Sequence, residues 1–284
     1  MKKHHPHVTL LFTLLFFVLA CHSLAPVQHR ITLDPRVDET SGLASIDNDL
    51  LTFNDSGGKA SLYRHGLDGK IRKEYSIRGT INRDWEDIAQ DDSLFYIADT
   101  GNNYATRKDL TIYKINKEFH LIDSIGIQYT KQTSFKRKKK NKFDAEALIA
   151  IDDSLVLFSK NRKSMKTQLY VFPKKSGNYK LSKRITYDVD ALITGGDYYS
   201  QQKQVLLTAY DFEERQYLFV LENFELNTLD QVSITRYQLP LQNAQVEAVK
   251  VTPDGKIWIS SEARNFQPPF LMEVKLETLN PSTR

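Results

Sequence analysis

The feature that most constrains the fold is a pair of large apolar residues that recurs about every fifty residues. The second members of these pairs lie at positions 63, 113, 170, 219 and 272 and are separated by 50, 57, 49 and 53 residues. A spacing this regular is typical of repeated structural units and is difficult to obtain from a β-sandwich. The pairs are Leu62-Tyr63, Ile112-Tyr113, Leu169-Tyr170, Leu218-Phe219 and Leu271-Met272.

Each pair belongs to a larger unit of short strands separated by Gly, Asn, Asp and Pro turns. A hydrophobic strand precedes each pair, and a shorter strand about ten residues earlier opens the unit. A more polar strand closes each of the first four units. The sequence predicts the preceding strands at 50–58, 95–103, 155–162, 205–211 and 257–264, and the closing strands at 71–77, 126–135, 179–187 and 231–239. No long stretch of helical periodicity follows residue 20.

Five units of four strands predict an all-β fold, a five-bladed β-propeller that fills residues 29–284 as one domain. The fifth unit has no closing strand of its own, and residues 29–33 form an unassigned strand at the other end of the chain. Pairing that N-terminal strand beside the fifth unit would close the ring and leave no sheet edge at the seam. A six-bladed ring is the alternative, but it needs strands that the sequence does not offer.

The N-terminus has the pattern of a secretory signal. Lys2 and Lys3 precede a 13-residue apolar run at 8–20, which is too short to span a membrane. The run ends at Leu19-Ala20-Cys21, which resembles a bacterial lipobox. We therefore expect a signal peptide at 1–20, lipidation of Cys21, a tether at 21–28 and an extracytoplasmic protein anchored to a bacterial membrane, in the periplasm or at the cell surface. Ordinary secretion is the alternative.

Cysteine and charge exclude several classes of partner. Cys21 is the only cysteine, so we expect no disulfide-linked partner and no thiolate metal site. Loss of residues 1–20 lowers the formal net charge from +4 to +2, which does not indicate nucleic-acid binding. The basic run at 136–142 is interpreted as a solvated loop, with contact to anionic lipid or glycan as the alternative.

The predicted topology gathers oxygen-bearing side chains at one end of the central channel, because the first two strands of each blade are antiparallel. Three carboxylates at that mouth would repel one another unless they were protonated or bound to a cation. Hard oxygen ligands without His or Cys suit Ca²⁺. The predicted calcium ligands, one at the start of each inner strand, are Ser41, Glu86, Glu146, Thr194 and Glu247. A polar, water-filled channel without a metal is the alternative.

The ends of the second strands lie on the same predicted face and would form a ligand-binding surface around the ring. Such residues are also ordinary turn formers, which is the alternative interpretation. The basic members could hold a phosphate or merely neutralise the acidic ring. The predicted surface comprises Asn54, Asp55, Asp99, Asn102, Lys160, Arg162, Asp211 and Glu262.

Two resemblances follow from these motifs. The pieces ETSGLA, NDSG, DWEDIA, YIADTGNN and DAEAL, spread over residues 38–264, resemble a bacterial lipoprotein-type β-propeller family of mostly unassigned activity. The Ser, Glu, Glu, Thr, Glu order of the ring also resembles the calcium-activated nucleotidases (apyrases), which are five-bladed propellers. That second resemblance implies a central Ca²⁺ held by hydroxyl and Glu side chains and hydrolysis of nucleoside diphosphates.

Three functions are consistent with this pattern, and the sequence leaves open whether the protein is an enzyme. No GxSxG motif, Ser/His/Asp set or phosphate-cradling glycine loop is present, so any hydrolysis would need a metal. We favour a membrane-tethered propeller whose calcium-organised face binds a small molecule or a partner protein. The alternatives are a Ca²⁺-dependent phosphoanhydride or phosphoester hydrolase of apyrase type, and a structural scaffold with neither metal nor turnover.

Overall fold

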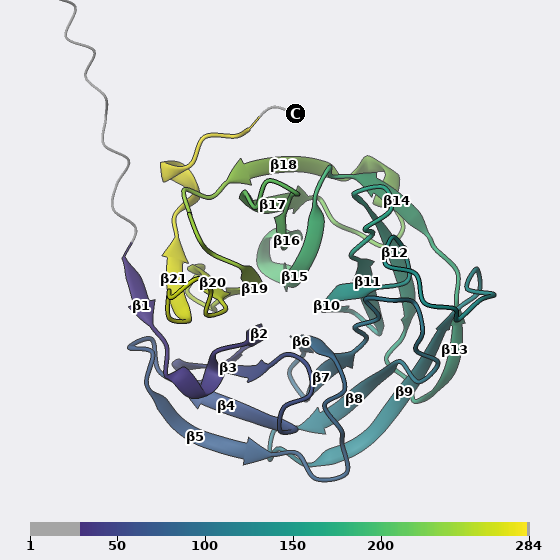
Figure 1. Ribbon diagram of the computed structural model, residues 1–284, viewed down its shortest axis with the longest axis horizontal. Helices are drawn as coiled ribbons and strands as arrows, with labels where there is room; N and C mark the ends of the chain where they lie inside the picture. Colours follow the sequence, from purple (N-terminus) through teal and green to yellow (C-terminus); the bar gives the residue numbers. More distant parts are fainter. Residues whose placement is uncertain (1–28, 283–284) are drawn as a thin grey trace, which may run out of the picture.

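The computed structural model describes residues 29–282, which form five β-sheets arranged around a central axis (Figure 1). The innermost strand of each sheet faces that axis. The inner strands are β2 (Thr40–Ile46), β6 (Trp85–Gln90), β10 (Ala145–Ile151), β15 (Leu192–Tyr199) and β19 (Val246–Val251). The predicted five-bladed propeller is confirmed, and the six-bladed alternative is wrong.

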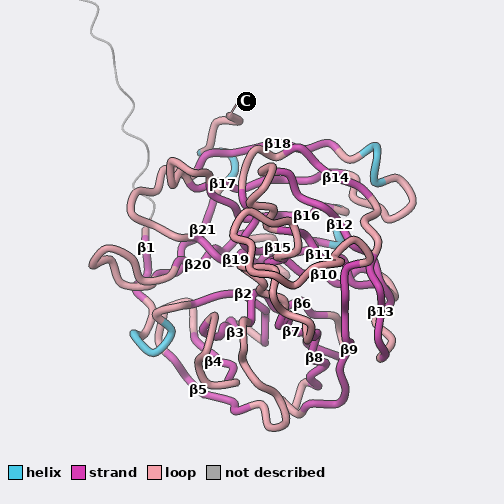
Figure 2. Tube along the Cα trace, turned by 45° about the vertical axis from the view of Figure 1, so that its right-hand side comes forward, coloured by secondary structure: helices cyan, strands magenta, loops and turns pink. Residues whose placement is uncertain are grey.

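Each blade continues outward through antiparallel neighbours. The second strands are β3 (Asp49–Asn54), β7 (Leu94–Asp99), β11 (Ser154–Ser159), β16 (Gln204–Tyr210) and β20 (Ile257–Ser261). The third strands are β4 (Ser61–His65), β8 (Thr111–Asn116), β12 (Lys166–Pro173), β17 (Gln216–Glu222) and β21 (Phe270–Val274). The outer strands of the first four blades are β5 (Ile71–Ser76), β9 (Leu121–Tyr129), β14 (Ile185–Asp188) and β18 (Ser233–Gln238). Figure 2 shows how little helix accompanies them.

The N-terminal strand closes the ring as predicted. β1 (Arg30–Thr32) pairs antiparallel with β21, and Ile31 lies opposite Leu271. The first described residues therefore form the outer strand of the last blade (Figure 1). This pairing covers the edge that the fifth blade would otherwise expose.

Two predicted outer strands need correction. The stretch 179–187 is not one strand: β13 (Gly177–Leu181) pairs parallel with β9 of the neighbouring blade, and only β14 pairs with β12. The nine-residue β9 pairs with β8 of its own blade only as far as Gly126, and its outer edge from Ile125 to Tyr129 pairs with β13. The strand predicted at 126–135 ends at Tyr129, because the Gln132 amide donates to the Tyr129 carbonyl and turns the chain away.

The hydrophobic core lies between the blades, as five clusters that each join two neighbouring sheets. Trp85 is fully buried between the first and second blades, with its ring edge-on to Phe53 at 5.5 Å between centroids. Trp258 is buried between the fifth blade and the first. Both tryptophans therefore pack between blades, where their large rings bury apolar surface.

Two carboxylates of the inner strands, the buried Asp87 and the half-buried Asp197, fasten blades to one another. The Asp87 carboxylate accepts hydrogen bonds from the amides of Leu148 at 2.8 Å and Gly196 at 3.1 Å, on the third and fourth blades. Asp197 accepts from the Val251 amide at 2.8 Å and pairs with Lys250 at 2.7 Å. These side chains tie four of the five blades together around the channel.

Nothing is described for residues 1–28, so the predicted signal peptide, Cys21 and the tether lie outside the described residues. Within residues 29–282 no helix has the length and apolar character needed to span a membrane.

Candidate functional site

A β-bulge in every inner strand marks the mouth of the channel. The pairing of inner and second strands shifts register around Glu86, Glu146, Thr194 and Glu247, and between Ser41 and Ala44 in the first blade. A bulge leaves one residue outside the ladder and redirects its side chain. The five predicted metal ligands therefore lie at or beside equivalent irregularities of the five blades.

The two hydroxyls of this set already have protein partners. Ser41 Oγ donates to the Glu86 carbonyl at 2.7 Å, and Thr194 Oγ1 donates to the Val246 carbonyl at 2.7 Å. Each bond joins one blade to the next, as does a third bond from Thr100 Oγ1 to the Ala145 carbonyl at 2.8 Å. A hydroxyl that donates keeps oxygen lone pairs, so both oxygens remain capable of accepting a cation.

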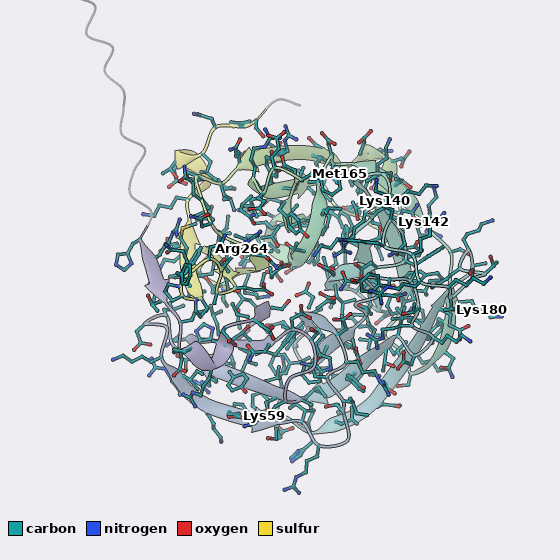
Figure 3. The ribbon with its side chains drawn as sticks, in the orientation of Figure 1. Lys59, Lys140, Lys142, Met165, Lys180 and Arg264 are labelled. Atoms are coloured by element: carbon teal, nitrogen blue, oxygen red, sulfur yellow. The ribbon has the colours of Figure 1, made fainter. Side chains whose placement is uncertain are left out.

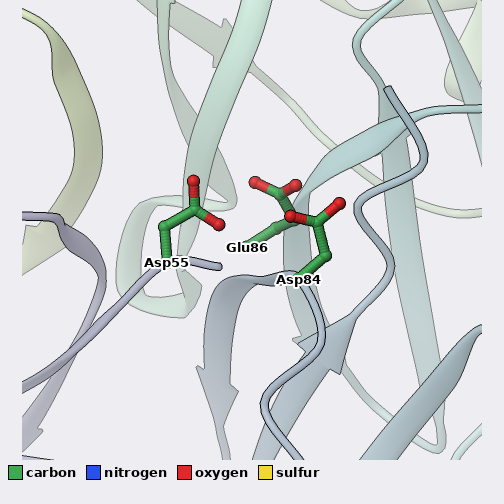
Figure 4. A group of neighbouring side chains, drawn as sticks. All are labelled: Asp55, Asp84 and Glu86. Carbon is green, nitrogen blue, oxygen red and sulfur yellow. The ribbon is translucent and has the colours of Figure 1, made fainter. Parts of the chain in front are cut away.

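Three carboxylates converge beside the channel axis. One oxygen each of Asp55, Asp84 and Glu86 lies within 4.8 Å of the others, and the three side chains point toward one another (Figure 4). Asp55 comes from the turn after β3, whereas Asp84 and Glu86 stand at the start of β6. None of the three forms an ion pair among residues 29–282. Three carboxyl groups therefore share one small space without a paired cation.

Gly101 provides the space for these carboxylates. A Cβ at that position would lie 2.1 Å from Glu86 Oε1 and 2.3 Å from the Asp84 carboxyl carbon, so an alanine there would force both carboxyl groups to move. The backbone of the turn after β7 therefore approaches the acidic group directly.

Two carboxylate oxygens of the mouth are buried without any hydrogen-bond partner in the described structure. They are Asp55 Oδ1 and Glu247 Oε1. Glu247 is only 5% exposed, so water cannot readily solvate its charge. Leaving a buried charged oxygen unpaired is costly, and a bound cation would remove that cost.

Glu146 has a different environment from Glu86, although the two are close. Oxygens of Glu86, Asp144 and Glu146 also lie within 4.8 Å of one another. Lys160 pairs with Glu146, and Arg162 pairs with Asp144 and lies 3.5 Å from Glu146. Two cations thus already balance this side of the mouth.

Burial and mutual repulsion shift the titration of the whole group. Burial, followed by the charges of Asp84 and Glu247, raises the pKa of Asp55 to about 8. Burial and the charges of Glu247 and Asp55 raise the pKa of Glu262 to about 9. Burial likewise raises the pKa of Glu86 well above its ordinary range. Without a cation, several of these carboxyls hold protons at neutral pH.

The predicted ligand-binding surface divides into three sets, of which Lys160 and Arg162 are the basic side chains already described beside Glu146. Asp99 pairs with Arg107 at 2.8 Å, and Asp211 accepts from Arg215 and Tyr217. The Asn102 side chain donates to the Phe143 carbonyl at 3.0 Å, and Asn54 donates to the Arg36 carbonyl at 2.8 Å. These four hold turns in place, whereas Asp55 and Glu262 belong to the acidic mouth.

Asp84 is a further candidate cation ligand, and the repeat spacing alone did not identify it. Asp84 precedes Glu86 by two residues, so it lies just before the bulge and turns to the same side. The signal is the run DWED, in which two carboxylates flank a buried Trp85. We therefore add Asp84 to the candidate cation ligands.

Comparison with known proteins supports the fold. No protein-family model matches the chain, and no curated protein shows significant sequence similarity. A glucose dehydrogenase structure superposes with a TM-score of 0.51 at 11% identity, over 87% of this chain and 99% of that chain. An exo-beta-1,3-galactanase from Phanerochaete chrysosporium, solved with beta-1,3-galactotriose, superposes with a TM-score of 0.54 at 9% identity, over 85% of this chain and 61% of the galactanase. At such low identity these likenesses establish a β-propeller and nothing about activity.

Proposed function

We propose that the acidic mouth binds one divalent cation, Ca²⁺, and that the cation organises a surface for binding a small molecule or a partner protein. The observation that carries the proposal is the group of Asp55, Asp84 and Glu86, which has no paired cation, next to the unpartnered, buried Glu247 Oε1. Only oxygen donors meet there, and calcium accepts six to eight of them in loose geometry.

The residues fit such an ion on three counts. Their oxygens are close enough to share one centre, Gly101 leaves room beside them, and buried oxygens lack other partners. Glu146, Ser41 and Thr194 complete the ring of sequence-predicted ligands. That all five ring positions contact one ion stays a prediction.

Chelation and replacement test the proposal. Isothermal titration of chelator-treated protein with CaCl₂ should give one site, and Mg²⁺ should bind more weakly because it demands tighter octahedral geometry. Glu247→Gln should weaken binding by about tenfold or more, since it removes a charged oxygen. The exposed Glu118, changed to Gln, is the matched control and should bind as the parent does. Absence of calcium binding in the parent protein would refute the metal centre.

We further propose that the protein is anchored to a bacterial membrane through Cys21. A lipid on Cys21 would hold the propeller at a bacterial membrane, outside the cytoplasm, where millimolar calcium can occupy a weak site. Mass spectrometry of the mature N-terminus tests the anchor: a diacylglyceryl group on Cys21 supports it, and an unmodified cysteine refutes it.

A hydrolase is the second candidate, and one observation favours it. Asp55 and Glu262 combine raised pKa values with a place beside the candidate cation, which is the property required of a general acid or base. Calcium-dependent release of phosphate from nucleoside diphosphates would support hydrolysis, and loss of that release in Glu262→Gln would assign the group. No release with calcium would leave the binding function alone.

A further inference from the structure

The loop between β9 and β10 lines a cavity whose charge is opposite to that of the acidic mouth. The cavity has a volume of about 320 Å³, within the size range of small-ligand pockets. Its lining includes six basic side chains from this one loop: Lys131, Lys136, Arg137, Lys138, Lys140 and Lys142. Lys163, in the turn after β11, adds a seventh from the next blade. No carboxylate lines the cavity.

The loop that carries the basic run at 136–142 is held in place by contacts with the turn after β7. The Lys138 amide donates to the Tyr104 carbonyl at 2.8 Å, and the Arg137 guanidinium stacks over the Tyr104 ring at 3.5 Å. The buried Asn141 donates from its side chain to the Asn103 carbonyl at 3.0 Å. Folding therefore fixes the backbone that carries the lysines, so a ligand need not order it.

The charges of the cavity are uncompensated. None of its seven basic side chains forms an ion pair with any residue of the range 29–282. Like charges held around one hollow repel one another, and the cavity walls concentrate their field. An anion that carries several charges would remove this repulsion and could accept several hydrogen bonds at once.

We propose that this cavity is a binding site for a compact polyanion with two or more phosphate or sulfate groups. A single phosphate would contact too few of the seven cations, and a cavity of this size holds a short oligophosphate. None of the candidate cation ligands lines this cavity, so binding there should need no calcium. Figure 3 labels Lys140 and Lys142 near each other, with Lys180 farther out at the rim.

Tripolyphosphate is the probe, measured by isothermal titration in calcium-free buffer with full-length protein. We expect binding that weakens steeply as NaCl rises from about 0.05 M to about 0.5 M, because salt screens the charges. Inorganic phosphate should bind at least about tenfold more weakly, since it makes fewer charge-assisted contacts. Equal affinity for the two anions would overturn the polyanion site.

A matched pair of double variants locates the site. Lys138→Ala with Lys140→Ala removes two cavity charges and should weaken tripolyphosphate binding by about tenfold or more. Lys139→Ala with Lys180→Ala removes two exposed charges that do not line the cavity and should leave binding unchanged. Equal weakening by both pairs would show net-charge attraction instead of a site and would overturn the proposal.

Vesicles distinguish a lipid headgroup from a soluble polyanion as the natural source. Binding to vesicles with anionic phospholipid that depends on Lys138 and Lys140 would make a phosphate headgroup the source. Tripolyphosphate binding without vesicle binding would make it a soluble polyanion. Failure of the protein to bind either probe at low salt would refute the site.

Discussion

The acidic mouth should make the stability of the calcium-free protein fall as pH rises. Asp55 and Glu262 have pKa values of about 8 and about 9 in the folded protein, above the ordinary 3.8 and 4.5. At pH values between the ordinary pKa and the raised pKa of each group, the folded state therefore binds more protons than the unfolded chain. The free energy of unfolding then decreases with pH, because the slope follows the difference in bound protons.

The size of the effect follows from the same pKa values. Between about pH 7 and about pH 9, a carboxyl with a pKa of about 8 loses roughly 1.4 kcal/mol of proton-linked stability, and one with a pKa of about 9 loses roughly 2 kcal/mol. Each charge raises the pKa of the other, so the joint loss is smaller than the sum. We expect roughly 2–3 kcal/mol, or a fall of about 5–10 °C in Tm.

Calcium should abolish that loss, because the ion binds the ionised carboxylates. The stabilisation by saturating calcium should therefore be larger at about pH 9 than at about pH 7, by the same roughly 2–3 kcal/mol. The buried His65, whose pKa burial lowers, titrates below this window and does not interfere. Asp87, with a pKa of about 8 raised by burial, contributes a slope that calcium does not remove.

Thermal melts at the two pH values, with calcium or with chelator, measure the effect. The Asp55→Asn, Glu262→Gln double variant should lose most of the calcium-sensitive slope and keep the part due to Asp87. A calcium stabilisation that is equal at both pH values, or larger at the lower one, would refute the assignment of these carboxyls to a cation site.

Three further predictions concern single positions. Asp87→Ala should lower the free energy of unfolding by about 3 kcal/mol or more in urea titrations, because it leaves the Leu148 and Gly196 amides unpaired. Asp92→Ala, at an exposed position, should change that free energy little. Equal effects of the two changes would contradict the role of Asp87 in joining blades. Gly101→Ala should weaken calcium binding by about tenfold or more, since its Cβ would meet Glu86 and Asp84. Gly58→Ala, whose Cβ would have no contact closer than 3.8 Å, should leave calcium binding unchanged. Unchanged calcium affinity in Gly101→Ala would argue against this cluster as the site. Ser41→Ala should cost about 1 kcal/mol of stability without calcium through loss of its bond to the Glu86 carbonyl, and a larger loss with calcium would assign the hydroxyl to the ion as well.

The sequence was sufficient for the architecture because the blades repeat. Apolar residues recur at equivalent places, so the pairs at Tyr63, Tyr113 and Tyr170 each mark a third strand. Ring closure followed from one unassigned strand at the N-terminal end and one missing strand in the fifth unit, and β1 does pair with β21. The equivalent positions of the ring residues were also predictable, and each proves to lie at or beside a bulge.

The chemistry of each ring position was less predictable, because it depends on neighbours from other strands, in the same blade or in the next one. Whether the Ser41 hydroxyl faces an ion or a carbonyl is decided by the Glu86 backbone, 45 residues away. Glu146 and Glu86 occupy equivalent bulges, yet only Glu146 is paired with a lysine, Lys160, which directly follows the neighbouring strand β11 of the same blade. The departure of β13 to its neighbour depended on the length of β9, which no local pattern of the 177–181 segment reveals.

The contrast between the two groups of buried channel carboxylates is the strongest argument that the acidic mouth is functional. Asp87 and Asp197 are satisfied by backbone amides and Lys250, so the fold can pair buried carboxylates completely when they serve only to join blades. One residue away from Asp87, at the bulge, Glu86 joins Asp55 and Asp84 in a group without a paired cation. Buried charge without compensation lowers stability, and proteins retain it mainly where a ligand supplies the missing partner. The same inner strand therefore carries one carboxylate that joins the blades, Asp87, and one that we propose as a cation ligand, Glu86.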